Sequence, residues 1–290
     1  MSAPRLRLSA VLILVVLWLP PSALAQPGGR GGPPPTPKAA APIDVTGYWV
    51  SVVSEDWRYR MVTPAVGDYQ GVPMTPEALK IADGWDPAAD EAAGLQCKSY
   101  GAAAIMRVPG RLHVTWLDDA TLRVEADAGT QTRTFRFAPP DAAAVNAAAV
   151  NAGAVTPPPA ATERTWQGES VARWDVPGGR GRGGPPPPGA PPPAGAAPPG
   201  PSVPRPGSLR VDTTNMRAGY LRKNGVPYGE DARLTEHFDA VRLRNGDELL
   251  VVTSIVEDAR FLTQPFIVST QFKKQPGAAG WDPTPCSSTW

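Results

Sequence analysis

Short segments in which apolar and polar residues alternate recur from about residue 43 to residue 275 of this 290-residue chain. Segment 121–127 (TLRVEAD) shows the pattern clearly, because Leu, Val and Ala occupy one face while Arg, Glu and Asp occupy the other. A period of two residues is typical of antiparallel strands that bury one face and expose the other. The pattern therefore predicts a protein built mainly of half-buried antiparallel strands.

The clearest group of predicted strands lies within Leu234–Lys274. Three strands are expected there, and the first two meet at Asn245-Gly246, a dipeptide strongly favoured in hairpin turns. The middle run, Glu248–Val256, is almost continuously apolar, which predicts a strand covered on both faces. Strands this apolar need more sheet to pack against, and the earlier part of the chain is expected to supply it.

Further strands are predicted where extended segments end at turn-forming dipeptides, which brings the total to about nine or ten. One helix is predicted to begin at Thr75, a capping hydroxyl followed by Pro76 and Glu77, and to end near Ala82. A further helical turn is expected at Pro87–Ala93. The additional strands are placed at about 43–53, 102–108, 112–116, 121–127, 130–137, 164–175 and 208–214, and segment 55–63 is interpreted as a second extended segment.

Many of the 37 prolines and 29 glycines fall in three low-complexity segments, at 26–42, about 138–162 and 176–207. Such segments cannot bury a core, so we predict one disordered linker and two disordered inserts. The rest of the chain, from 43 to 290, is long enough for one domain. Sequential hairpins within one domain predict a mostly β fold, a single antiparallel up-and-down β-barrel of about 8–10 strands with one short helix.

The first 25 residues have the features of a secretory signal peptide. Arg5 and Arg7 precede an apolar run at 8–19, and Ala23-Leu24-Ala25 fits the small-residue rule for cleavage after Ala25. The apolar run is too short to span a bilayer comfortably. The mature protein is therefore predicted to be periplasmic or secreted, with no membrane span after cleavage.

The two cysteines and the balanced charge restrict the possible metal sites and binding partners. Cys97 and Cys286 have no spaced histidine or cysteine partner of the kind that metal sites use, so an exported chain is predicted to join them in a disulfide. The formal charge is +1, from 28 basic and 27 acidic residues. A nucleic-acid-binding surface requires a basic stripe, which this balance argues against.

The opening of the first strand, Gly47-Tyr48-Trp49, resembles the G-x-W signature of lipocalins and related calycin barrels. In that family the tryptophan plugs the closed end of the barrel. The second lipocalin signature, T-D-Y, has no counterpart, since Gly67-Asp68-Tyr69 falls too early. The late arginine that packs on the tryptophan is not assigned, and Arg260, Lys273 and Lys274 are its candidates.

A wider resemblance covers most of the ordered chain and points to a family of uncharacterised exported bacterial proteins. That family brings no established activity, so the resemblance supports the domain limits alone. The segments that carry it are GYWVSVVSEDWRYRMVTP, QCKSYGAAAIMRVPGRLHVTW, DAGTQTRTFRF, GYLRKNGVPYGEDARLTEHFD and VVTSIVEDARFLTQPF.

The resemblance and the nine tryptophans favour a small-molecule binding protein without catalysis, whose ligand is apolar or amphipathic. Aromatic and Met side chains are expected to line the barrel, and the loop at 217–228, rich in Arg and Tyr, to gate its mouth. The histidines are expected on the polar side, where no third ligand completes a metal or haem site, so no cofactor is predicted. The predicted ligand-binding residues are Trp49, Trp57, Tyr59, Met106, His113, Trp116, Phe135, Tyr220, Arg222 and His237.

Two other classes of function remain as alternatives. No hydrolase, nucleotide-binding or zinc-protease motif is present, but Glu55, Asp56, Glu257 and Asp258 would form a carboxylate site in an envelope enzyme if the fold brought them together. The non-catalytic interpretation is that these acids are solvated or pair with neighbouring arginines. The third hypothesis is an envelope interaction module that uses its Pro-rich segments as spacers, with protein partners that the sequence does not name.

Overall fold

The computed structural model describes residues 34–138, 163–176 and 207–290. The predicted signal peptide and residues 26–33 of the predicted N-terminal linker lie outside these residues, as do nearly all of the two predicted inserts. Residues 34–42, which were predicted to be part of the disordered linker, are described, and the Trp174 indole N–H donates to the Pro37 carbonyl at 2.7 Å.

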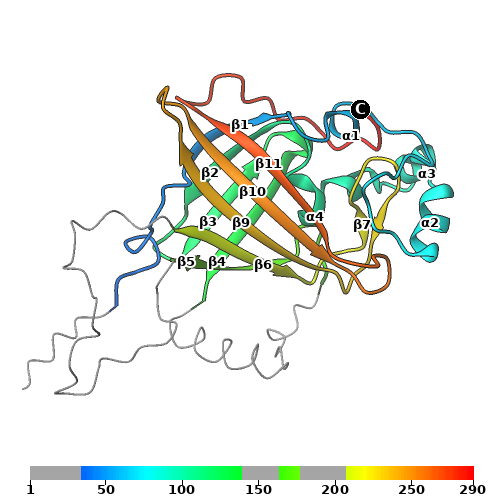
Figure 1. The fold of residues 1–290 in the computed structure, drawn as a ribbon, viewed down its shortest axis with the longest axis horizontal. Helices are drawn as coiled ribbons and strands as arrows, with labels where there is room; N and C mark the ends of the chain where they lie inside the picture. Colours follow the sequence, from blue (N-terminus) through cyan, green and yellow to red (C-terminus); the bar gives the residue numbers. More distant parts are fainter. Residues whose placement is uncertain (1–33, 139–162, 177–206) are drawn as a thin grey trace, which may run out of the picture. The chain divides into compact units, whose positions relative to one another are not determined.

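Among the described residues, nine strands close into a barrel in the order β1-β11-β10-β9-β6-β5-β4-β3-β2 (Figure 1). Neighbouring strands are antiparallel except β4 and β5, which run parallel. Both strands therefore start at the same end of the barrel. The predicted mostly β, single-barrel fold is confirmed, with this one departure from an up-and-down order. The strands are β1 Gly47–Val52, β2 Arg111–Trp116, β3 Thr121–Ala126, β4 Gln131–Phe137, β5 Glu169–Asp175, β6 Ser208–Thr214, β9 Arg233–Arg242, β10 Glu248–Glu257 and β11 Phe266–Gln275.

One end of the barrel is covered by residues 53–110 and 215–232, which we call the cap (Figure 1). The cap joins the barrel where β10 ends and β11 begins, through a bridge between Met74 and Leu262. Its elements are α1 Trp57–Arg60, α2 Pro76–Asp83, α3 Pro87–Ala92, the 3-10 helix η1 Gln96–Tyr100, α4 Ala102–Ile105, and a small sheet of β7 Gly219–Tyr220 and β8 Pro227–Tyr228. A further 3-10 turn, η2 Ala128–Thr130, lies between β3 and β4.

Two apolar clusters form the core, one inside the barrel and one beneath the cap. The barrel cluster includes Trp49, Phe135, Phe238 and Phe272, all at most 2% exposed. The cap cluster includes Tyr228 and residues from the cap-facing ends of the strands. Burial of this much apolar area is the main favourable contribution to folding.

A belt of buried polar side chains separates the two clusters inside the barrel. Each belt residue lies two positions along its strand from a residue of the barrel cluster, so it points to the interior as well. Arg133 and Glu236 form the centre, with Nη1 and Nη2 of the arginine donating to the two carboxylate oxygens at 3.0 and 2.6 Å. The belt consists of Arg133, Ser170, Thr213, Glu236, Ser254 and Thr270.

Several local predictions are confirmed. Helix α2 begins after Thr75, whose hydroxyl accepts a hydrogen bond from the Ala78 N–H at 3.2 Å, and α3 forms at the predicted second turn. Strands β9 and β10 form the predicted hairpin. The Gly246 N–H donates to the Leu243 carbonyl, and Gly246 takes a φ of 87°, the left-handed region that favours glycine at this turn.

Three predictions of strand structure are wrong. Segment 55–63 contains the short helix α1, and segment 102–108 contains α4. An alternating stretch of about four residues fits a single helical turn as well as a strand, which explains the first error. The third concerns β10, where buried positions alternate with half-buried ones, so only the inner face is fully covered.

The tryptophan of the G-x-W segment is completely buried in the barrel. Its indole N–H donates to the Val45 carbonyl at 3.0 Å. Lys274 lies opposite Trp49 in the β1–β11 register, and its ammonium group is 5.2 Å from the centre of a Trp49 ring. Of the three candidates for the late cation, Lys274 therefore takes the place beside the tryptophan.

Candidate functional site

Four cationic side chains of the cap lie close together at the end of α1. Arg60 ends α1, Arg107 follows α4, and Arg222 with Lys223 lies between β7 and β8. All four are at most 6% exposed. Arg60 is anchored by two hydrogen bonds, from Nε to the Arg107 carbonyl at 2.8 Å and from Nη2 to the Ser51 hydroxyl at 3.1 Å. The cluster therefore ties α1 to both the barrel rim and the rest of the cap.

A cavity of about 20 Å³, partly open to solvent, lies among these cations. This volume holds one water-sized group, or the oxygen end of a small ligand. The residues that line it are mainly cationic or aromatic: Tyr59, Arg60, Ser99, Ala104, Arg107, Val108, Leu221, Arg222, Lys223 and Trp290.

Acidic side chains offset this positive charge only in part. Asp56 Oδ2 lies 3.0 Å from Arg107 Nη1 and 4.0 Å from Arg222 Nη2. Glu55 Oε2 lies 3.7 Å from Arg60 Nη1. Both carboxylates stand at the exposed edge of the cluster, with 38% of each side chain accessible to solvent. Two carboxylates therefore pair with the three arginines, and no ion pair to Lys223 is found within the described parts of the chain.

Three of the buried guanidinium nitrogens have no hydrogen-bond partner among the described residues. They are Arg60 Nη1, Arg107 Nη2 and Arg222 Nε, one from each arginine of the cluster. A buried N–H group without an acceptor costs about 1–3 kcal/mol, and more when it is charged. An anionic group in the cavity would remove this cost and supply the missing negative charge.

The electrostatic environment disfavours the charged forms of these side chains. Burial lowers the pKa of Arg60, Arg107 and Arg222, and for Arg60 and Arg222 the charge of Arg107 lowers it further, to about 10 for Arg222. Burial also lowers the pKa of Lys223 to about 8, while Glu91 opposes the shift. A bound anion would stabilise all four cations.

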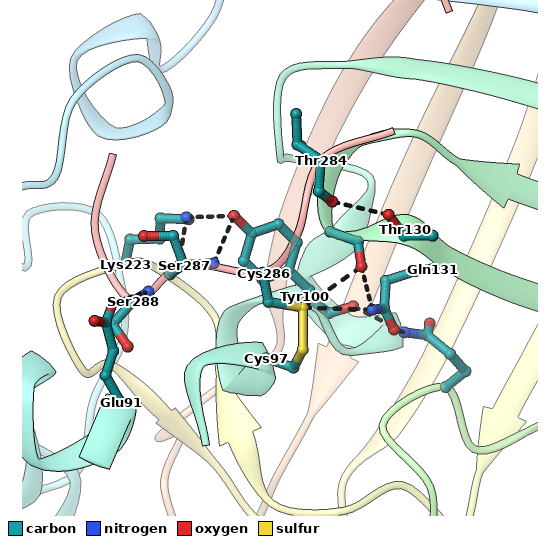
Figure 2. Close-up of a disulfide and its surroundings, with 12 residues drawn as sticks. Glu91, Cys97, Tyr100, Thr130, Gln131, Lys223, Thr284, Cys286, Ser287 and Ser288 are labelled. Atoms are coloured by element: carbon teal, nitrogen blue, oxygen red, sulfur yellow. Dashed lines mark hydrogen bonds between the residues drawn. A yellow bond between two sulfur atoms is a disulfide. The ribbon is translucent and has the colours of Figure 1, made fainter. Parts of the chain in front are cut away.

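Aromatic rings and the C-terminal segment complete the walls of the cavity. The guanidinium of Arg222 lies 4.0 Å from the centre of the Tyr59 ring. Lys223 Nζ donates to the Tyr100 hydroxyl at 2.7 Å and to the Ser287 carbonyl at 2.8 Å, as Figure 2 shows, and lies 3.8 Å from a Trp290 ring. Lys223 thus connects the cap to residues 276–290, which we call the tail.

The predicted disulfide is confirmed and fixes the tail to the cap. Cys97 of η1 is bonded to Cys286, 189 residues later (Figure 2). Beyond this bond, the Ser288 N–H donates to Glu91 at 3.2 Å and the Trp290 N–H donates to Thr63 at 2.8 Å. The bond therefore holds the tail against the cation cavity.

Two predicted ligand-binding residues, Tyr59 and Arg222, line this cavity, and a third lies in the same cap. Tyr220 donates to Asp90 at 2.9 Å and accepts from Lys98 at 3.2 Å. Arg60, Arg107 and Lys223 were missed as site residues, because nothing in their spacing shows that the fold brings them together. Of these three residues, only Lys223 could have been identified from the sequence, because it lies in the basic and aromatic loop at 217–228.

The other predicted ligand-binding residues lie elsewhere. Trp49, Met106, Trp116 and Phe135 belong to the barrel cluster or pack against it. Trp57 and Tyr59 were expected to line the barrel, and this expectation is wrong because both lie on α1 in the cap. Trp57 is 62% exposed there.

The two histidines face the outside of the barrel, on the polar side as expected. His113 contacts Glu125 at 3.1 Å and stacks on Tyr48 with ring centres 4.0 Å apart. His237 lies on β9 opposite Thr253, next in sequence to the interior-facing Glu236. Within the described ranges, no group of three or more His, Cys, Asp or Glu is placed to hold a metal ion.

The carboxylates of the enzyme hypothesis have separate surroundings. Glu55 and Asp56 contact the arginines of the cation cluster. Asp258 accepts hydrogen bonds from the backbone N–H groups of Gly229, Arg260 and Phe261, so it stabilises the turn after β10. Glu257 is exposed at the end of that strand. In the described structure, no hydrogen bond joins the first pair to the second.

Comparison of the chain with protein families, with curated proteins and with solved structures gives no match. The described helices include none with the length and apolar character needed to cross a membrane. The barrel and the cation cavity are therefore the basis for a functional assignment.

Proposed function

We propose that this protein binds a small ligand through an anionic group held in the cation cavity of the cap. The observation that carries the proposal is the set of three buried guanidinium nitrogens without a hydrogen-bond partner, one from each of three arginines that line a cavity with excess positive charge. Charged hydrogen bonds formed away from water are among the strongest non-covalent contacts available to a protein. One oxygen of a carboxylate matches the size of the cavity, and the planar carboxylate matches the geometry of guanidinium groups.

The proposal keeps the expected class, a lipocalin-like exported binding protein without catalysis, but places the anionic group in the cap. Large side chains already occupy the barrel, where Trp49, Phe135 and Phe272 are each at most 1% exposed. The loop at 217–228 was expected to gate the mouth of the barrel. In the proposal it contributes Arg222 and Lys223 directly to the ligand site.

Replacing Arg222 with glutamine is expected to weaken acetate binding at least about tenfold, because one charged hydrogen bond contributes about 1.5–3 kcal/mol. Acetate is a suitable probe since it consists of little more than the carboxylate. Binding is measured by isothermal titration calorimetry and by the rise in Tm with acetate concentration.

The matched control is Arg242→Gln, which removes an exposed arginine that pairs with Glu248 at 2.8 Å, outside the cap. Measured at the same ionic strength, this variant should bind acetate like the wild type. Equal acetate binding by the Arg222→Gln variant and the wild type would contradict the proposal. Circular dichroism of both variants without acetate separates loss of binding from loss of fold.

Acetate affinity is also expected to fall as the pH rises from about 7 to 9. The pKa of Lys223 is lowered to about 8, so the side chain is cationic below that pH and neutral above it. Acetate remains ionised throughout, and Arg222 keeps its charge because its pKa is about 10. Tyr100, which contacts Lys223, stays protonated because burial raises its pKa. Titration calorimetry at several pH values measures the effect.

The Lys223→Met variant serves as the control for this pH dependence. It should bind acetate more weakly at pH 7 and show a flat affinity between pH 7 and 9. A similar fall with pH in the variant and the wild type would assign the titration to another group and refute the role of Lys223.

A further inference from the structure

Large apolar side chains are exposed together in one short segment of the cap, residues 57–66. Trp57, Met61, Val62 and Val66 are between 47% and 62% exposed. Scattered exposed apolar residues are normal on protein surfaces, but four within ten residues are a candidate contact surface. We call these four side chains the apolar rim.

The apolar rim is directly connected to the cation cavity. Tyr59 and Arg60, which line the cavity, belong to the same short helix as Trp57. On the other side, the Trp290 N–H donates to the hydroxyl of Thr63, next to Val62. Trp290 lines the cavity and is itself 45% exposed. A ligand that leaves the cavity between Tyr59 and Trp290 would therefore meet apolar side chains first.

The size of the cavity restricts the anionic group. About 20 Å³ accepts one oxygen of a terminal carboxylate, a group that is attached to the rest of its molecule at one point. A phosphodiester, as found in phospholipid head groups, carries substituents on two sides, which hinder the entry of its oxygens more than the single attachment of a carboxylate does. The cavity thus favours single-chain acids over the head groups of a bilayer.

We propose that the ligand is an acidic amphiphile, a single-chain carboxylate whose head group binds in the cation cavity and whose hydrocarbon chain lies on the apolar rim. This inference rests on the proposed function and adds the substrate class. Each methylene group fully removed from water would raise the affinity about fourfold, and on a partly open surface about twofold.

The test is calorimetric titration of the full chain with acetate, hexanoate, octanoate and decanoate, all below their micelle concentrations. The affinity is expected to rise about twofold with each added methylene group. Decan-1-ol should bind far more weakly than decanoate, because it has the chain without the charge. Equal affinity for acetate and decanoate would overturn the inference and leave the proposed function standing. Failure of every acid to bind would overturn both.

The variant Trp57→Ser/Met61→Ser tests where the chain lies. It should reduce decanoate affinity at least fivefold and leave acetate affinity unchanged. Leu117→Ser/Ile267→Ser removes two similarly exposed apolar side chains from the barrel strands and their turns, and should change neither affinity. If Trp57→Ser/Met61→Ser leaves decanoate affinity unchanged, the chain lies elsewhere, for example inside the barrel, and the inference is wrong.

A bilayer is the rival occupant of the apolar rim, and vesicles test it. Little co-sedimentation of the wild type with phosphatidylglycerol vesicles is expected. Strong co-sedimentation that the Trp57→Ser/Met61→Ser variant loses, together with no dependence on acid chain length, would assign the rim to a membrane surface and overturn the inference.

Discussion

Replacing Glu236 with leucine is expected to lower the free energy of unfolding by about 3–5 kcal/mol. Glu236 is completely buried, and its carboxylate is bound by both terminal nitrogens of Arg133, which is 2% exposed. The substitution leaves a buried guanidinium without its counter-charge, and this unpaired cation causes most of the loss. Urea unfolding followed by circular dichroism measures the change.

Two controls separate the unpaired charge from lost packing. The double variant Arg133→Met/Glu236→Leu removes both charges and is expected to recover most of the stability. The exposed pair of Arg242 and Glu248 provides the comparison, since Glu248→Gln is expected to cost less than about 1 kcal/mol. A loss below 1 kcal/mol for Glu236→Leu alone would show that Arg133 finds other partners or water.

Removing the disulfide with Cys97→Ser/Cys286→Ser is expected to lower the free energy of unfolding by about 3–5 kcal/mol. The bond restricts the unfolded chain across 189 residues, so its loss increases the entropy of the unfolded state. The tail would also lose its covalent attachment beside Lys223. We therefore expect weaker acetate binding in addition to lower stability.

The measurements are urea unfolding and acetate titration, each with and without a reducing agent. The reducing agent should destabilise the wild type by about as much as the double substitution does and leave the variant unaffected. Unchanged stability in the variant would mean that the noncovalent contacts of the tail are sufficient. Unchanged acetate affinity would mean that the cavity does not depend on the attached tail.

The alternation of apolar and polar residues was sufficient to predict the barrel. Segment 121–127 contains β3, and the group from Leu234 to Lys274 contains most of β9, β10 and β11. Side-chain direction in a strand repeats every two residues, so local sequence carries this information. The alternation predicts the wrong structure for Trp57–Arg60, because four residues are too few to distinguish a strand from one helical turn.

The polar belt left a signal in the sequence. Glu236 is in phase with Leu234 and Phe238, and Arg133 is in phase with Phe135. Charged residues of opposite sign at inward-facing positions predict a buried pair, because neither is stable alone in a core. The cation cavity gave no comparable signal, since it combines residues 60, 107, 222 and 223 through tertiary packing alone.

The closure of the barrel by β1 and β11 has a consequence for how the chain acquires its structure. Trp49 pairs with Lys274, so the pairing that seals the barrel joins residues more than 200 positions apart. Contacts of such long range form slowly, because much of the chain must be ordered before they contribute. Until β11 is available, β1 presents an unpaired edge that neighbouring chains can bind. Folding is therefore expected to be slow and sensitive to protein concentration, with aggregation as its main competitor.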